Sequence, residues 1–103
     1  MSLLMIAAVT IHDDPEAQQR YEGYVAGGVL SLGIHDAEVL ASCEAPRIVE
    51  GTLPGQKIVV IRFRDQAHFD AWYNSPEYQN VLPIRKADAD TAFVLVAEEL
   101  DLG

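Results

Sequence analysis

The sequence is poor in cysteine and in basic residues, and each shortage excludes a class of protein. Cys43 is the only cysteine among 103 residues, so no disulfide can form within the chain. Seven Lys and Arg stand against 16 Asp and Glu, which gives a net charge of −9. Binding to nucleic acid or to an anionic membrane needs clustered cations that neutralise phosphates. We therefore expect no nucleic-acid partner and no membrane partner.

Long apolar runs are also lacking. No stretch approaches the roughly 18 apolar residues of a membrane span. The opening run SLLMIAAVTI is apolar, but no basic segment precedes it and it stops at His12-Asp13-Asp14, so an internal strand is favoured over a signal peptide. We expect a cytoplasmic protein, and the length predicts a single domain over residues 1–103.

What the sequence does contain is apolar β-structure. The segments 3–11, 57–63 (KIVVIRF) and 91–100 each place apolar residues on both sides of a predicted strand. A strand that is apolar on both sides has to be covered on both sides. These three segments therefore predict a sheet with two buried faces.

A long helix is predicted between the first two strands. Asp14 is suited to the N-cap and Pro15 to the first helical position, and Gly33 is the expected end. A buried stripe is expected at helical spacing, formed by Tyr21, Val25, Gly28, Val29 and Leu32. The pair Gly27-Gly28 costs about 1 kcal/mol per glycine relative to alanine. The pair indicates either close packing of the helix on the sheet or room for a ligand.

The second half of the chain predicts shorter elements. A strand is expected over 37–42, and residues 47–51 either continue it or form a separate short strand. Asp65 is expected to cap one helix, and Ser75-Pro76 to begin another that Pro83 bends or interrupts. Residues 101–103 are expected to form a tail.

This order of elements is that of the ferredoxin-like βαββαβ fold, an α+β architecture with a four-stranded antiparallel sheet. Right-handed crossovers place both helical segments on one face of the sheet. The other face then exposes an apolar patch larger than the roughly 300–600 Å² usual for monomers. We expect a homodimer joined sheet to sheet; a monomer with that face in water is the alternative.

Four segments carry a resemblance to a known family: AWYNSPEYQ (71–79), RIVEG (47–51), KIVVIRF (57–63) and FVLVAEE (93–99). With them the chain resembles the small bacterial family known as the domain of unknown function numbered thirteen-thirty. The resemblance implies a ferredoxin-like fold of the dimeric α/β-barrel group, which includes cofactor-free monooxygenases, muconolactone-type isomerases and haem-binding proteins. The family has no settled activity, so it supplies no catalytic residue. Arg64 departs from the pattern, in which proline often follows the strand.

A ligand cleft is expected between the sheet and the helices. The candidates for its lining are aromatic residues and one cation: Tyr24, Trp72, Tyr73, Tyr78 and Arg85. An Arg pairs with a carboxylate and a Tyr donates to a carbonyl or oxyanion, so this set favours an aromatic or enolic acid as ligand. The alternative for Trp72 and Tyr78, which their residue types favour, is that they form part of the core between helices and sheet. Arg85 is also consistent with a surface ion pair, for example with Glu77, Asp88 or Glu50.

Metal, haem and other cofactors are not expected. His12, His35 and His68 fall at different parts of the predicted fold and do not converge, as ligands of a metal must. No histidine is well placed for haem on the helical face. Glu50 is a general base only if buried, and Cys43 has no neighbouring base to activate it.

Three functions fit these features. The first is a cofactor-independent oxygenase or isomerase of a small aromatic or enol-like metabolite, the second a non-catalytic small-molecule-binding dimer, and the third a purely structural dimerisation module. The size of the cavity near Tyr78 and Arg85 separates the third from the others. A volume under about 100 Å³ is too small for a ligand site, since such sites usually measure roughly 300–1,000 Å³.

Overall fold

The computed structural model describes residues 1–100. The chain forms four strands and four helical segments in the order β1 (Leu3–Ile11), α1 (Pro15–Ile34), β2 (Glu38–Cys43), β3 (Lys57–Phe63), α2 (Gln66–Tyr73), α3 (Pro76–Gln79), α4 (Leu82–Asp88) and β4 (Ala89–Glu98). The expected tail at 101–103 lies outside the described residues.

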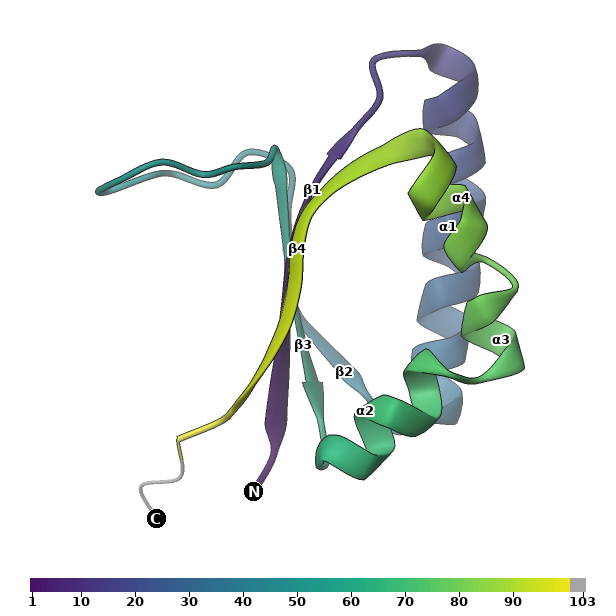
Figure 1. The fold of residues 1–103 in the computed structure, drawn as a ribbon, viewed down its shortest axis with the longest axis vertical. Helices are drawn as coiled ribbons and strands as arrows, with labels where there is room; N and C mark the ends of the chain where they lie inside the picture. Colours follow the sequence, from purple (N-terminus) through teal and green to yellow (C-terminus); the bar gives the residue numbers. More distant parts are fainter. Residues whose placement is uncertain (101–103) are drawn as a thin grey trace.

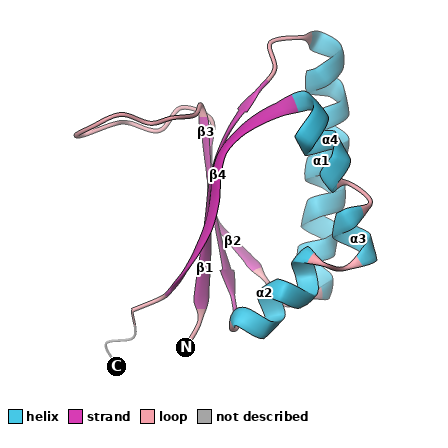
Figure 2. Ribbon diagram, in the orientation of Figure 1, coloured by secondary structure: helices cyan, strands magenta, loops and turns pink. Residues whose placement is uncertain are grey.

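The molecule has two layers, a sheet and a layer of helices (Figure 1). The strand order is β2-β3-β1-β4 and every neighbouring pair is antiparallel. All the helices lie on the same side of the sheet, as Figure 2 also shows. The α+β, ferredoxin-like fold class predicted from the order of elements is confirmed.

Side-chain caps begin three of the helices where the sequence predicts them. The side chains of Asp14, Asp65 and Ser75 each accept a hydrogen bond from the backbone N–H three residues further on, at 3.2, 2.8 and 3.2 Å. Each cap satisfies a backbone donor that the first turn of the helix leaves without a partner. Pro83 lies in the first turn of α4 and separates it from α3, so the predicted interruption is confirmed.

Helix α1 continues past the predicted stop at Gly33. It ends at Ile34, and the left-handed turn that follows falls on Asp36, with φ 55°. Asp tolerates this conformation because its short polar side chain can form local hydrogen bonds. The predicted apolar stripe is also only partly correct, since Val25 and Val29 remain substantially exposed.

The strand predictions need three corrections. The strands expected over 37–42 and 91–100 are shifted to Glu38–Cys43 and Ala89–Glu98. No strand forms over 47–51, although these residues carry part of the family pattern. Residues 44–56 instead form a long connection, which we call the arm. The arm extends away from the sheet on the side opposite the helices (Figure 1).

The strand register assigns each apolar side chain to one face. Met5, Val59 and Val94 pack toward the helices. The opposite side, which we call the open face, is almost entirely apolar across the three strands β3, β1 and β4. Its residues are Leu4, Ile6, Ile58, Val60, Phe93, Leu95 and Ala97, together with Ala8, which Gly55 of the arm helps to cover.

An ion pair between the half-exposed Arg20 and the buried Asp88 joins the first and last helices. Arg20 of α1 donates to both carboxylate oxygens of Asp88 at the end of α4, at 2.9 and 2.7 Å. These hydrogen bonds hold the pKa of the Asp88 carboxyl below its usual value. A carboxyl whose pKa is lowered in the folded state stabilises the fold above its unfolded pKa and loses that contribution as pH falls through the folded value.

We therefore expect Asp88→Asn to lower the melting temperature at pH 7, and the deficit relative to the unmodified protein to shrink below about pH 4, where unperturbed aspartates become protonated. Melting curves at half-unit steps from pH 3 to pH 7 would show this. The substitution Asp13→Asn, at an exposed carboxyl, is the matched control. A deficit for Asp88→Asn that is the same at every pH would contradict the assignment.

Among residues 1–100, no helix is both long enough and apolar enough to cross a membrane.

Candidate functional site

A cavity of about 120 Å³ lies between the helices and the sheet. Met5, Ala7 and Val9 of β1 form part of its floor, and residues of α1, α2, α3 and α4 close it from the other side. The side chains around it are mostly apolar, and no Asp, Glu, His or Cys of residues 1–100 lines it. The volume exceeds the limit of about 100 Å³ below which only the structural function would remain. The cavity is smaller than the roughly 300–1,000 Å³ of typical ligand sites, so it has room only for a small ligand.

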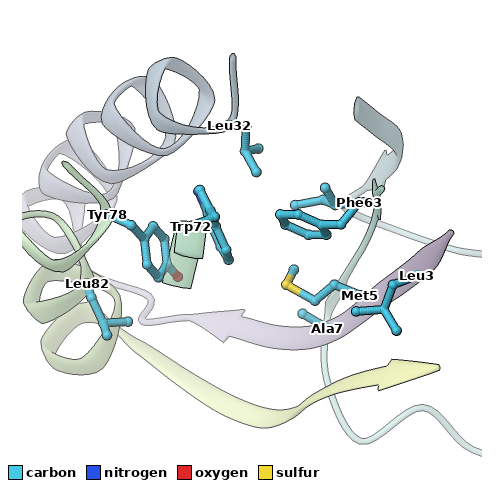
Figure 3. Packing of buried hydrophobic residues seen from close by; sticks show 9 residues of the cluster. Leu3, Met5, Ala7, Leu32, Phe63, Trp72, Tyr78 and Leu82 are labelled. Carbon is cyan, nitrogen blue, oxygen red and sulfur yellow. The ribbon is translucent and has the colours of Figure 1, made fainter. Parts of the chain in front are cut away.

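One wall of the cavity is aromatic and rigid. Trp72 lies between Tyr78 and Phe63, with ring centroids 4.0 and 5.3 Å away (Figure 3). Its indole N–H donates to the Ser31 hydroxyl at 2.9 Å, and that hydroxyl donates to the Gly28 carbonyl at 2.6 Å. Trp72 is therefore a fixed part of the core and also lines the cavity.

Two phenol groups meet at the cavity. The hydroxyls of Tyr24 from α1 and Tyr78 from α3 lie 2.7 Å apart and share a hydrogen bond. Burial, together with the neighbouring Tyr78, raises the pKa of Tyr24 far above its ordinary value. Burial also raises the pKa of Tyr21, and the nearby Arg85 charge offsets this in part. The Tyr24 and Tyr21 hydroxyls therefore stay protonated at physiological pH, so each can donate a hydrogen bond to a ligand.

Arg85 brings a buried positive charge to the same place. Only 6% of its surface is exposed. One terminal N–H donates to the Thr91 hydroxyl at 2.5 Å, while the buried Nε has no hydrogen-bond partner. The surface ion pair considered as an alternative is not found, because Arg85 forms no ion pair within residues 1–100. Within these residues the arginines that form ion pairs are Arg20, Arg62 and Arg64.

A buried cation without a counter-ion is costly unless something negative pairs with it. Here the guanidinium lines a cavity whose other polar groups include tyrosine hydroxyls. Such a set of donors can bind a carboxylate, or the oxygen of an ionised phenol or enol. The arrangement is suited to holding a small anion with an apolar body.

The two glycines of α1 serve different purposes. A methyl group at Gly27 would lie 2.6 Å from Cγ1 of Val81, so this glycine permits close contact between helices. A methyl group at Gly28 would meet no atom within 4 Å, and Gly28 lines the cavity. Close packing therefore explains Gly27, although against Val81 and not against the sheet as predicted, and room beside the sheet explains Gly28.

The structure brings all five of the predicted lining residues to this one cavity: Tyr24, Trp72, Tyr73, Tyr78 and Arg85. Their role in binding stays a prediction. Sequence reasoning missed Tyr21 and Lys57 as lining residues, whereas room for a ligand at Gly27-Gly28 was one of its two interpretations. The signal for Lys57 was available, because it continues the alternating row of Val59, Ile61 and Phe63 that faces the helices.

The other residues considered for chemistry lie elsewhere. His12 contacts Asp90 at 3.0 Å and the His68 ring contacts Asp65 at 2.7 Å. Glu50 is exposed on the arm. Within residues 1–100, no three His, Cys, Asp or Glu side chains come together as a metal would require.

The sequence matches the domain of unknown function DUF1330 over residues 2–98. The chain belongs to this family. The resemblance noted in its sequence segments is thereby confirmed, and the match extends beyond those segments to nearly the whole chain. No curated protein is similar enough in sequence to match.

Solved structures share the fold of this DUF1330 chain at low sequence identity. A protein of unknown function from Rhodopseudomonas palustris is 14% identical, with a TM-score of 0.76 over 97% of this chain and 83% of that one. SnoaB, a cofactor-independent oxygenase from Streptomyces nogalater, is 9% identical, with a TM-score of 0.69 over 97% and 94%. A dimeric protein of unknown function with a ferredoxin-like fold, from Bacteroides fragilis, is 11% identical, with a TM-score of 0.65 over 95% and 96%. At these identities the likeness establishes the fold.

Proposed function

We propose that this protein binds a small aromatic or enol-like acid as its anion in the cavity and, as a cofactor-independent oxygenase or isomerase, converts it. The observation that carries the proposal is the buried Arg85, which lines an apolar cavity without an acidic partner in residues 1–100. The shared fold with an oxygenase that needs no cofactor is consistent with it.

The proposed chemistry rests on stabilising negative charge. Arg85 and the hydroxyls of Tyr24 and Tyr78 are held in place by the fold, so they need little reorganisation to receive an oxyanion. Stabilising the ionised form lowers the pKa of a bound phenol or enol. The resulting electron-rich anion can react with oxygen or take up a proton at another carbon. No metal or organic cofactor is required for either step.

A non-catalytic binding protein is the second candidate, and one observation favours it. Among the described residues, the cavity lining contains no Asp, Glu, His or Cys that could take a proton from a substrate near neutral pH. Turnover therefore depends on a ligand that ionises readily by itself. A ligand that does not would be bound and released unchanged.

The proposed assembly is a homodimer that covers the open face. The open face is apolar over three strands and lies opposite the helices. The arm extends on this same side and carries Ile48 and Val49, of which Val49 is 80% exposed. A second copy placed sheet to sheet would remove both apolar surfaces from water. The cytoplasmic location expected from the sequence stays a prediction.

A fluorescence screen tests the proposal, because Trp72 is the only tryptophan and lines the cavity. Titration with benzoates, hydroxybenzoates and enolic acids should change its emission, and the uncharged amides of the same compounds should not. Oxygen uptake and mass spectrometry of the mixtures then separate an oxygenase or isomerase from a binding protein. If no acid changes the Trp72 emission, the remaining function is that of a structural dimerisation module.

The two glycines give a matched pair of variants. Gly28→Ala should stabilise the fold by about 1 kcal/mol, because it removes a helical glycine without a clash. It should also weaken binding of any ligand found in the screen, because the new methyl group projects into the cavity. Gly27→Ala should destabilise the fold by up to about 2 kcal/mol, since overpacking against Val81 outweighs the gain in helix propensity.

Thermal melts and fluorescence titrations of both variants check this prediction. Gain of stability with loss of binding in Gly28→Ala identifies the space as a ligand site. If Gly28→Ala binds as tightly as the unmodified protein, the ligand lies elsewhere.

A further inference from the structure

The cations of this acidic chain are distributed unevenly, and two of the seven line the cavity. They are Arg85 and Lys57. Lys57, like Arg85, forms no ion pair within residues 1–100, and none of the acidic residues in that part of the chain lines the cavity. A small cavity that gathers two cations and excludes every carboxylate indicates a ligand with more than one negative group.

Lys57 belongs to the inner side of the sheet. It pairs with Val9 in the register of β3 and β1 and continues the row of residues that face the helices. Its ammonium group lies 5.8 Å from the centre of the Tyr21 ring, and Tyr21 also lines the cavity. The lysine stem therefore lies within the layer between sheet and helices, and the charge sits beside the cavity lining.

The register also places the two cations at opposite sides of the cavity floor. Val9 of β1 pairs with Lys57 on β3 and with Thr91 on β4. Arg85 donates to the Thr91 hydroxyl. Lys57 on β3 and the Thr91 hydroxyl that accepts from Arg85 are thus at the same level of the sheet, on the two strands that flank β1. Two strand spacings separate these strands, a distance of about 10 Å.

Lys57 also lies where the cavity adjoins a second space. It lines a second, larger groove of about 550 Å³ together with Tyr21 and Val25, which line the cavity as well. Beyond these shared residues the groove carries Glu22 and Glu44. Those two carboxylates would repel an acidic group placed further out. The favourable position for a second anionic group is therefore at Lys57, at the boundary of the two spaces.

From this charge placement we propose that the ligand is a diacid: a flat aromatic or enol-like compound with one acidic group on Arg85 and the tyrosine pair and a second on Lys57. The proposal deepens the function proposed above and rests on it. It makes Lys57 a residue that determines specificity, because a monoacid of the same shape would leave the ammonium group unpaired.

Pairs of a diacid and its monomethyl ester test this inference, because the ester keeps the size and removes one charge. Terephthalate and 4-carboxyphenylacetate are suitable probes, each measured against its monomethyl ester by Trp72 fluorescence. We expect at least one diacid to bind at least fivefold more tightly than its ester. In Lys57→Met the preference should fall to within twofold while the affinity for the ester changes little.

Lys86→Met is the matched control, since Lys86 is the other lysine of the chain and is exposed near the end of α4. It should keep the full preference for the diacid. Esters that bind as well as the diacids, or a preference that survives in Lys57→Met, would overturn the inference and leave the proposed function standing. If the diacids, their esters and the simple acids of the wider screen all fail to bind, both the diacid inference and the proposed function are wrong.

Discussion

Leu95→Glu is expected to sediment as a single chain of 11.3 kDa at micromolar concentrations at which the unmodified protein sediments at twice that mass. Leu95 lies on the open face, on β4, in register with Ile6 of β1. In the proposed sheet-to-sheet dimer each substitution buries an unpaired carboxylate, which costs several kcal/mol, and two-fold symmetry introduces it twice. The dimer should weaken by a factor of about 1,000 or more, since each 1.4 kcal/mol is tenfold.

The same substitution on the outer side of the molecule serves as its control. Leu30 on α1 is 73% exposed, against 44% for Leu95. Leu30→Glu changes charge and hydrophobicity equally and should leave the dimer intact. Sedimentation equilibrium of the three proteins distinguishes the outcomes. An unmodified protein that stays soluble as one 11.3 kDa species would remove the dimer from the proposal.

Arg85→Met is expected to abolish measurable ligand binding while the fold becomes no less stable. The variant removes a buried charge that has no acidic partner in residues 1–100, and an apolar residue of similar length fills the space. Losing a buried charge-assisted contact to a ligand anion costs about 2–5 kcal/mol, or roughly 30- to several-thousand-fold in affinity. Loss of ligand binding without loss of stability distinguishes a binding residue from a structural one.

Two further variants sharpen this test. Arg85→Lys keeps the charge and loses the planar fork of donors, so binding should be intermediate. Arg64→Met removes an exposed arginine that pairs with Asp36 at 3.9 Å, and should leave binding unchanged. Thermal melts and fluorescence titrations of all three variants are the measurements. A marked loss of stability in Arg85→Met with unchanged binding would make Arg85 a structural residue.

The local sequence predicted most of the elements because its signals are themselves local. An aspartate or serine before a helix bonds to a backbone N–H three residues away, as Asp14, Asp65 and Ser75 do. Lys57–Phe63 was predicted to the residue, because its apolar run is bounded by a turn and by charged residues. The predictions over 47–51 and at Gly33 failed where no such constraint exists.

The candidate site was predictable in its aromatic members and less so in its polar ones. Tyr24, Trp72 and Tyr78 repeat on faces of helices that must cover the sheet, so their convergence follows from the fold class. Arg85 shares the inner side of its helix, but the sequence was consistent with either a surface pair or a buried charge. Its burial depends on how α4 packs against β4, which is a contact between elements.

The amino-acid sequence alone establishes a ferredoxin-like order of strands that are apolar on both sides, with helices for one side only. It could not decide which residues of each strand face the helices. Side chains along a strand alternate between the two faces of the sheet, and here the residues on both faces are apolar, so the pattern does not distinguish the faces. Only the tertiary structure turned Met5 inward and Ile6 outward, assigned contact to Gly27 and space to Gly28, and brought Lys57 and Arg85 to one cavity. These choices depend on packing between segments distant in sequence, where no local signal acts.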